Sequence, residues 1–371
     1  MSGPIYIFAG GGTGGHIYPG LAVAEALTGR RPEARVVFAC SYRDLDRRIL
    51  DSTSHGVVPQ PVRPLPRRPG DVPAFASAWA RSRRLARDMV RDLRPAAVLG
   101  LGGFAAAPLV RQAARVGVST ALLNPDAVPG KANRYLARRV EVIFTQFDST
   151  TPAIAAPLRH KVRRTGCPMR SRLINGSRSE ALAAFDLRED RRTLLVLGGS
   201  TGARTINEAF AAFRPAMADL ADKWQALHVT GRDRAGVAPP DEDAGGPRVR
   251  ETLYCDRMDL AYAVADLALC RGGAVTVAEL SAVGLPAVVM PYPYHRDQHQ
   301  KRNAAALAEA GAAVVCHDAA DAAANARALA DCVLPILRDE TRLESMRRAA
   351  AARSDTDAAS AVADWLAGKA G

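Results

Sequence analysis

Short apolar runs alternate with helix-compatible segments along almost the whole chain. Runs of this length without polar alternation are typical of strands buried on both faces of a parallel sheet. Their order predicts an α/β fold with two Rossmann-like doubly wound parallel-sheet domains, which 371 residues can support. The runs cover residues 5–9, 35–40, 96–101, 119–124 and 141–146 in the first half, and 193–199, 224–231, 265–270, 285–292 and 312–316 in the second.

Proline, arginine and turn residues collect between residues 157 and 190, which places the join between the domains there. We therefore expect one domain over 1–160 and a second over 161–371. A short helical pattern at 360–368 could pack back on the first domain, and residues 236–246 read as a surface loop within the second.

Basic residues outnumber acidic ones by 50 to 38, which gives a formal net charge of +12. Such a surface attracts phosphate-bearing substrates or an anionic membrane face. Nucleic acid is not expected, because the basic residues are not interleaved with a base-stacking platform. The six cysteines form no C-x-x-C pair, which predicts reduced thiols, and the lack of a signal peptide or spanning run predicts a soluble or peripheral protein.

Each half opens with an apolar strand, a glycine-rich turn and a helix: "IFAGGGTGGHIYPGLAVAEAL" at 7–27 and "LLVLGGSTGARTINEAF" at 194–210. Such turns direct backbone N–H groups toward an anion at a helix start, and Pro19 suits an early helical position. The alternative is a simple tight turn, and the third turn, 100–108, could line the same site or only pack. Neither a dinucleotide fingerprint with its acid nor a phosphate-loop lysine motif is present.

A second constellation lies at 270–307. Arg271 and two glycines precede a helix that we expect to begin near Ala274. Glu279 on this helix could accept hydrogen bonds from a ribose diol, or it could be a solvated helix residue. Four polar residues follow, of types that also bind metals. They lack a clear tetrahedral pattern, so we favour sugar or phosphate hydrogen bonding and expect no metal site; these residues are His295, Asp297, His299 and Gln300.

The motifs together resemble the MurG family of bacterial glycosyltransferases. The matching stretches include "GGGTGGHIYPGLAVAEAL", "AVPGKANRYLAR", "VLGGSTGARTINEAF" and "DQHQKRNAAALAEAGAAVV", in family order over nearly the whole chain. The resemblance implies a GT-B fold with an inter-domain cleft. It also implies inverting, cofactor-free transfer of N-acetylglucosamine from its UDP donor to the undecaprenyl-linked muramyl-pentapeptide of peptidoglycan synthesis. The first domain would face acceptor and membrane, and the second would bind the UDP-sugar.

The resemblance also implies the site residues. His16 would be the general base, although it could only brace its loop, and Asp126 is a second candidate base. The donor UDP-N-acetylglucosamine would contact Thr13, Gly14, Gly15, Asp126, Arg170, Ser200, Cys255, Ala274, Val275, Thr276, Val277, Glu279 and Gln300.

One departure from the family pattern concerns the donor site. Asn124, Pro125 and Asp126 stand where the family usually has Glu-Gln-Asn, so a carboxylate replaces an amide. Asp126 could act as a base, repel the diphosphate or accompany a changed acceptor. A UDP-sugar 2-epimerase and a non-catalytic UDP-sugar-binding protein therefore stay as alternatives.

The segment 74–93 is an arginine-rich helix with interspersed Phe75, Trp79, Leu85 and Met89. Its apolar and basic residues could contact an anionic leaflet, or its apolar side could simply face the core. The family resemblance implies a peripheral location at the cytoplasmic face of the cell membrane, with roles in cell wall biogenesis, cell shape and division, and cell-wall or division proteins as partners.

Overall fold

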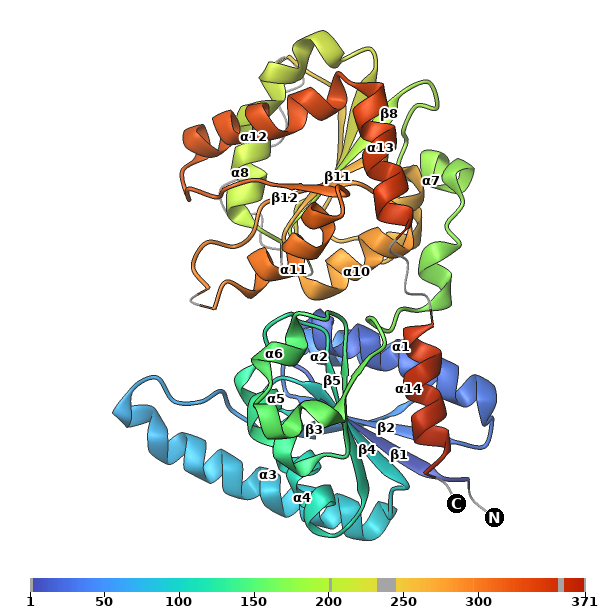
Figure 1. Cartoon of the computed structure of the whole chain (residues 1–371), viewed down its shortest axis with the longest axis vertical. Coiled ribbons are helices and arrows are strands. Elements are labelled where there is room, and N and C mark those ends of the chain that lie inside the picture. The colour runs from blue at the N-terminus through green and yellow to red at the C-terminus, as the bar shows by residue number, and fades with distance from the viewer. Residues whose placement is uncertain (1–2, 200–201, 232–244, 296, 353–356, 370–371) are drawn as a thin grey trace. The chain divides into compact units, whose positions relative to one another are not determined.

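The computed structural model describes residues 3–199, 202–231, 245–295, 297–352 and 357–369. The chain divides into two compact units. The first contains Met1–Arg170 together with Thr356–Gly371, and the second contains Ser171–Asp355 (Figure 1). The expected boundary at 160/161 thus falls at 170/171, and the end of the chain belongs to the first unit.

The described part of the first unit contains one sheet of parallel strands in the order β3-β2-β1-β4-β5-β6-β7. The direction of winding reverses between β1 and β4, so their carboxyl ends leave a crevice where ligands bind in doubly wound sheets. The strands are β1 (Ile5–Gly10), β2 (Arg35–Ser41), β3 (Gly56–Gln60), β4 (Ala97–Gly102), β5 (Ser119–Asn124), β6 (Val142–Thr145) and β7 (Val162–Arg164).

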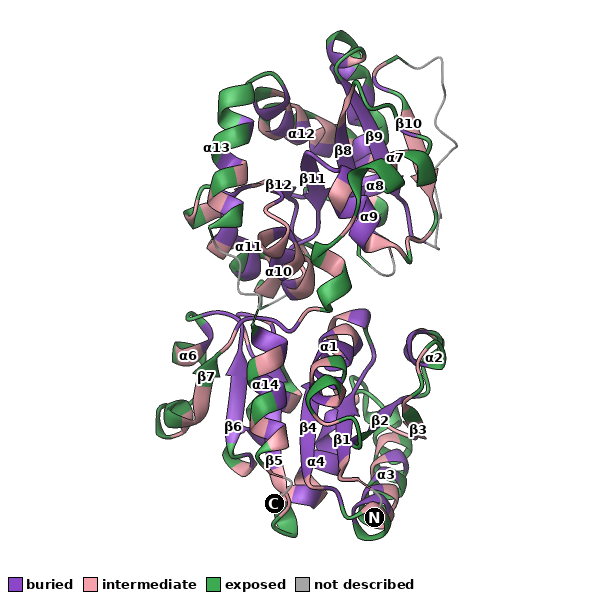
Figure 2. Cartoon of the chain, turned by 90° about the vertical axis from the view of Figure 1, so that its right-hand side faces the viewer, coloured by how far each residue is buried: buried purple, intermediate pink, exposed green. Residues whose placement is uncertain are grey.

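Helices cover both faces of this sheet because side chains of successive strand residues point to opposite faces. Tyr6 and Phe8 pack with one set of helices, which includes α1, α2 and α14, and Ile7 and Ala9 pack with α3, α4 and α5. Figure 2 shows the buried strands between these helices. The helices are α1 (Gly14–Arg30), α2 (Asp44–Asp51), α3 (Val72–Leu93), α4 (Ala106–Arg115), α5 (Lys131–Leu136), α6 (Thr150–Ala153) and α14 (Ala358–Ala367), with 3-10 turns η1 (Pro69–Asp71), η2 (Ala137–Arg139) and η3 (Ala156–Lys161).

The described part of the second unit repeats this winding, with parallel strands in the order β10-β9-β8-β11-β12-β13. Leu194, Val196 and Leu269 lie in a core with α8, α12 and α13. The strands are β8 (Arg192–Leu197), β9 (Trp224–Val229), β10 (Val249–Thr252), β11 (Leu267–Cys270), β12 (Ala287–Val289) and β13 (Ala313–Val315). The helices are α7 (Arg178–Ala184), α8 (Arg204–Phe213), α9 (Met258–Val264), α10 (Ala274–Ala282), α11 (His299–Glu309), α12 (Ala322–Leu337) and α13 (Glu340–Ala351), with η4 (Ser171–Ile174) and η5 (Arg214–Leu220).

The C-terminal helix α14 completes the core of the first unit and packs beside α1 (Figure 1). Leu366 is fully buried there, and the ring of Trp365 meets that of Phe144 edge-on at 6.0 Å. At the surface, Arg30 Nε donates to Asp364 Oδ1 at 2.6 Å. Residues from the two ends of the chain therefore share one hydrophobic core.

Three edge strands, β3, β7 and β10, were not predicted from the sequence. Each is short and carries proline or charged residues, as edge strands commonly do. Pro19 also lies deeper in its helix than expected, because α1 already begins at Gly14. The loop expected at 236–246 falls largely outside the described residues.

Candidate functional site

The first glycine turn joins β1 to α1 and is held by a buried acid. Both carboxylate oxygens of Asp46 accept a hydrogen bond from Gly12 N–H, at 2.8 and 3.0 Å. Asp46 Oδ2 also accepts from the backbone N–H and hydroxyl of Ser41, at 3.2 and 2.6 Å. One backbone N–H that we expected to face an outside anion thus has an anion of the protein as its partner.

Asp46 was not among the residues predicted from the sequence, although its position on the apolar face of α2 could have indicated it. On α2 it shares a face with Ile49 and Leu50, three and four residues later, and all three are buried. A carboxylate on the apolar face of a helix requires hydrogen-bond donors inside the protein. The donors are those of the glycine turn.

His16 lies in the first turn of α1, next to the carboxyl end of β4. Thr13 Oγ1 lies 3.0 Å from Nδ1 of His16. Gly102 adopts a φ of +101°, and a Cβ atom there would stand 2.8 Å from Cδ2 of the imidazole. The third glycine turn therefore contacts the His16 ring directly, which a residue with a side chain at Gly102 would prevent.

Two opposing influences set the basicity of His16. Burial lowers the pKa of the imidazole from its usual 6.5, while the charges of Asp126 and Asp46 and a hydrogen bond with the Gly11 carbonyl act in the raising direction. The net pKa is lowered, so His16 is neutral at neutral pH and able to accept a proton.

Asp126 follows β5 and is placed by a polar network. Asn124 Nδ2 donates to the backbone carbonyl of Asp126 at 2.7 Å, and Asn133 Nδ2 donates to Asn124 Oδ1 at 2.9 Å. The hydroxyl of Thr150 also donates to the Asp126 carbonyl, at 3.3 Å. The structure thus brings Asp126 within electrostatic range of His16.

The remaining predicted residues of the first unit lie near the same helix start. Thr13 is exposed, Gly14 is buried and Gly15 is partly buried. Arg170 is exposed, and its guanidinium lies 5.2 Å from the ring centroid of Tyr18 on α1. Stacking on Tyr18 keeps the cation of Arg170 beside α1.

In the second unit, the predicted constellation is built around the start of α10, which begins at Ala274 as expected. Buried Arg271 donates to Asp318 Oδ2 and to the carbonyl of Met290, both at 2.8 Å. Arg271 also donates to the hydroxyl of Thr205, near the start of α8. Arg271 therefore joins the two glycine-bearing turns of the second unit rather than offering its charge to solvent.

Glu279 faces inward from α10 and is half-buried. Its Oε2 accepts a hydrogen bond of 2.8 Å from the hydroxyl of Tyr262 on α9. Burial, and then the charge of Glu279, raises the pKa of Tyr262 well above its usual 10, so the phenol stays protonated and donates. Burial likewise raises the pKa of Cys255 to about 11, which makes it a neutral thiol near Tyr262. No sequence signal distinguished Tyr262 from a core residue.

Gln300 lies in the first turn of α11 against the turn that precedes α10. A Cβ atom on Gly272 would stand 2.2 Å from the carbonyl oxygen of Gln300, so the two backbones touch. Gln300 Oε1 accepts a 2.8 Å hydrogen bond from Tyr292 N–H. The structure thus places Gln300 beside the turn before α10, where Val275 and Thr276 are half-buried and Ala274 and Val277 are buried.

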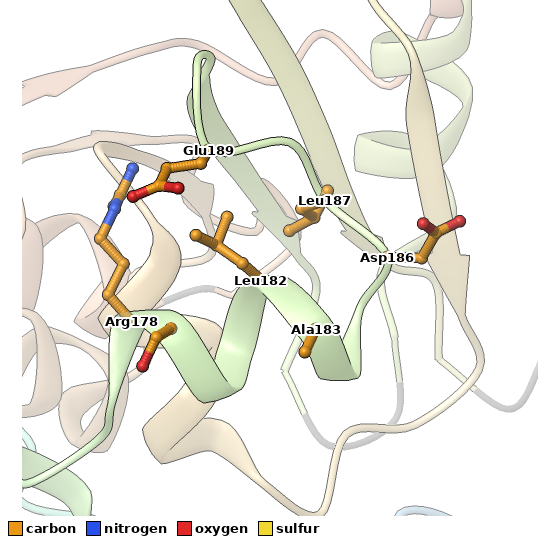
Figure 3. Close-up of a pocket in the computed structure, with 7 residues that line it drawn as sticks. Arg178, Leu182, Ala183, Asp186, Leu187 and Glu189 are labelled. Atoms are coloured by element: carbon orange, nitrogen blue, oxygen red, sulfur yellow. The ribbon is translucent and has the colours of Figure 1, made fainter.

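The predicted residues therefore form two groups. The first unit holds Thr13, Gly14, Gly15, His16, Asp126 and Arg170, and the second holds Cys255, Ala274, Val275, Thr276, Val277, Glu279 and Gln300; Ser200 lies outside the described residues. A pocket of 620 Å³ in the second unit lies elsewhere, along α7, where Arg178, Leu182 and Glu189 are among its lining residues (Figure 3).

Helix α3 separates its apolar and basic residues. Trp79, Leu85 and Met89 pack into the core of the first unit, whereas Arg83 and Arg87 are exposed. None of the helices among the described residues combines the length and the apolar character that crossing a bilayer requires.

The sequence matches glycosyltransferase family 28 over most of its length. Residues 6–145 match the N-terminal domain of that family, and residues 193–362 match its C-terminal domain. The second match reaches into α14, which the structure places in the first unit.

A protein of Halothermothrix orenii is 36% identical over 348 residues, with 92% of each chain covered. It is named UDP-N-acetylglucosamine–N-acetylmuramyl-(pentapeptide) pyrophosphoryl-undecaprenol N-acetylglucosamine transferase. The crystal structure of Acinetobacter baumannii MurG superposes with a TM-score of 0.74 at 25% identity, over 98% of this chain and 99% of that one.

The fold alone is shared more widely. The UDP-GlcNAc 2-epimerase of Neisseria meningitidis gives a TM-score of 0.69 at 12% identity, over 98% of this chain and 100% of that one. The fold is thus GT-B, and the close sequence relatives separate transferase from epimerase within it. The chain belongs to the MurG family of UDP-sugar-dependent transferases, within glycosyltransferase family 28.

Proposed function

We propose that this protein transfers N-acetylglucosamine from UDP-N-acetylglucosamine to a lipid-linked muramyl-pentapeptide in peptidoglycan synthesis. The observation that carries the proposal is a half-buried imidazole held against the Gly102 turn, at the winding reversal of the first sheet. Burial lowers the pKa of this imidazole, and the chain is 36% identical to a transferase so named. The transfer inverts the anomeric configuration, because one attack by the acceptor hydroxyl displaces UDP from the opposite face.

In this mechanism His16 is the general base. Its Nδ1 is engaged with Thr13, so Nε2 takes the proton as the acceptor hydroxyl attacks the anomeric carbon. Asp126 stabilises the imidazolium that forms, since its negative charge acts to raise the pKa of His16. Asp126, which replaces the asparagine of the family pattern, would thus take part in the reaction.

The second unit binds the donor. Glu279, oriented by the Tyr262 hydroxyl, accepts hydrogen bonds from the ribose diol, and the N–H groups at the start of α10 face the diphosphate. Gln300 contacts the sugar, Cys255 and Ser200 add donor contacts, and Arg170 and the start of α1 at Thr13–Gly15 offset charge on the leaving UDP. No cofactor takes part in this scheme.

The acceptor is anchored in a membrane, so we also propose a peripheral position at the cytoplasmic face. Leu65 and Val72, before and at the start of α3, are 54% and 48% exposed, and the outward arginines of α3 suit anionic headgroups. Charge reversal of Arg83 and Arg84 should reduce cosedimentation with anionic vesicles but leave zwitterionic vesicles unaffected. Cell-wall and division proteins, and effects on cell shape and division, belong to the same proposal.

UDP release tests the activity directly. Purified protein is given UDP-N-acetylglucosamine with and without the lipid-linked muramyl-pentapeptide, and the lipid is analysed by mass. Acceptor-dependent release with one added N-acetylhexosamine is expected. An interconverted UDP-sugar without acceptor would identify an epimerase, and binding without turnover a non-catalytic protein.

Two variants test the assigned roles. His16→Ala should lower kcat by about 10²- to 10⁴-fold with little change in donor affinity, and Glu279→Ala should mainly raise KM for the donor. Glu25→Ala and Glu309→Ala, at exposed positions of α1 and α11, are the matched controls. Small and equal effects of both site variants would refute the assignment.

A further inference from the structure

Three side chains of metal-binding types meet at the loop before α11. The ligand atoms of His295, Asp297 and His299 all lie within 4.8 Å of one another. The imidazole rings of His295 and His299 lie 4.4 Å apart between centroids, and His299 Nδ1 is 2.8 Å from Asp297 Oδ1. Gln300 is excluded from this group, because its side chain bonds to Tyr292 N–H.

The local backbone explains why this sequence brings the three together. Gln298 adopts a left-handed conformation with φ of +50° just before α11, which turns the backbone between Asp297 and His299. The Asp297 carboxylate then also accepts from His299 N–H, at 3.3 Å. The ring of His295 packs against Tyr292 at 4.9 Å, so each of the three side chains has a contact that orients it without an ion.

We propose that His295, Asp297 and His299 bind a divalent transition-metal ion such as Zn²⁺. Two imidazoles and one carboxylate match the ligands that Zn²⁺, Co²⁺ and Ni²⁺ prefer, whereas Mg²⁺ prefers an all-oxygen set. Three protein ligands leave coordination positions open for water. The proposal replaces, for these three residues, the sugar or phosphate hydrogen bonding that we expected from the sequence, where the spacing had indicated no metal site. The metal site serves no step of the proposed transfer.

The observed spacing is close to that of a metal site. Ligands at about 2.0–2.2 Å from a tetrahedral ion stand roughly 3.3–3.6 Å apart. The Asp297–His299 pair at 2.8 Å needs to open slightly, and the widest separation between ligand atoms, which is no more than 4.8 Å, needs to close by at most about 1.5 Å. His295 and Asp297 are exposed, so rotation of their side chains supplies this movement without repacking a core.

Metal titration of the untagged protein tests the proposal, since an oligohistidine tag would itself bind the ions. Calorimetry with Zn²⁺ should show one saturable site, and Co²⁺ should develop visible d–d absorption without a thiolate charge-transfer band. His295→Ala, His299→Ala and Asp297→Asn should each weaken binding by about tenfold or more. Circular dichroism verifies that the variants fold.

His160→Ala and His317→Ala are the matched controls, because both histidines are exposed and lie outside the cluster. Neither should change the affinity. The proposal is overturned if the wild type shows no saturable binding, if the controls weaken binding as much as the cluster variants, or if Mg²⁺ competes equally. None of these readouts depends on transferase activity.

Discussion

Replacement of Asp46 should loosen the glycine turn that carries His16. The side chain is fully buried and accepts hydrogen bonds from Gly12 N–H and from the N–H and hydroxyl of Ser41. Asp46→Ala leaves all three donors without this acceptor, whereas Asp46→Asn retains one oxygen but not the charge.

The expected change in the free energy of unfolding follows from the three hydrogen-bond donors that lose Asp46 as their acceptor. A buried donor without a partner costs about 1–3 kcal/mol, and the Ser41 hydroxyl can rotate while the two backbone N–H groups cannot. We therefore expect Asp46→Ala to lower the free energy of unfolding by about 2–6 kcal/mol and Asp46→Asn by about 1–3 kcal/mol. Asp51→Asn, at an exposed position of the same helix, should change it by less than about 0.5 kcal/mol.

Urea unfolding followed by tryptophan fluorescence measures the effect. A Trp224→Phe background leaves Trp79 and Trp365, which both report on the first unit. Both Asp46 variants should also lower kcat more than they raise KM for the donor, because the turn positions His16. Equal unfolding midpoints for Asp46→Ala and Asp51→Asn would refute the reasoning.

Three further outcomes follow from the structure. A general base must be unprotonated, and burial lowers the pKa of His16, so kcat should be constant at neutral pH and decrease only below about pH 6.5. Asp126→Asn removes a charge that raises the pKa of His16, so the decrease in kcat should move to lower pH. Tyr262→Phe should weaken UDP binding about tenfold, measured by calorimetry, since it removes one hydrogen bond to a carboxylate of about 1.5 kcal/mol. Leu366→Ala should lower the free energy of unfolding of the first unit by about 2–5 kcal/mol, followed by Trp79 and Trp365 in the Trp224→Phe background. Trp224 fluorescence in a Trp79→Phe, Trp365→Phe background should report an unchanged second unit.

The central strands were predictable because both of their faces are buried. Runs such as "IYIFA" and "TLLVL" carry no polar alternation, so they can lie only inside a covered sheet. The edge strand β7 (Val162–Arg164) could not be found this way, because an edge needs no apolar run and both of its arginines are exposed. Pairing with β6, which depends on the rest of the sheet, makes this segment a strand.

The positions of site residues were predictable where a glycine-rich turn comes directly before the helix that carries them. The glycine turn placed His16 at the start of α1, and the turn before Ala274 placed Glu279 on α10. The partners Asp46 and Tyr262 could not be identified with them, because each comes from a different helix and meets its partner only through the tertiary fold. The roles of these residues stay predictions until the variants are measured.

The position of α14 has a consequence for synthesis on the ribosome. Residues 358–367 emerge after the whole second unit, yet they supply Val362, Ala363 and Leu366 to the core built on β1. At about 5–20 residues per second, translation of the roughly 200 residues after Arg170 takes about 10–40 s. During that interval the nascent first unit lacks the helix that covers the apolar side of α1, and transiently exposed apolar surface of this kind promotes aggregation until α14 docks.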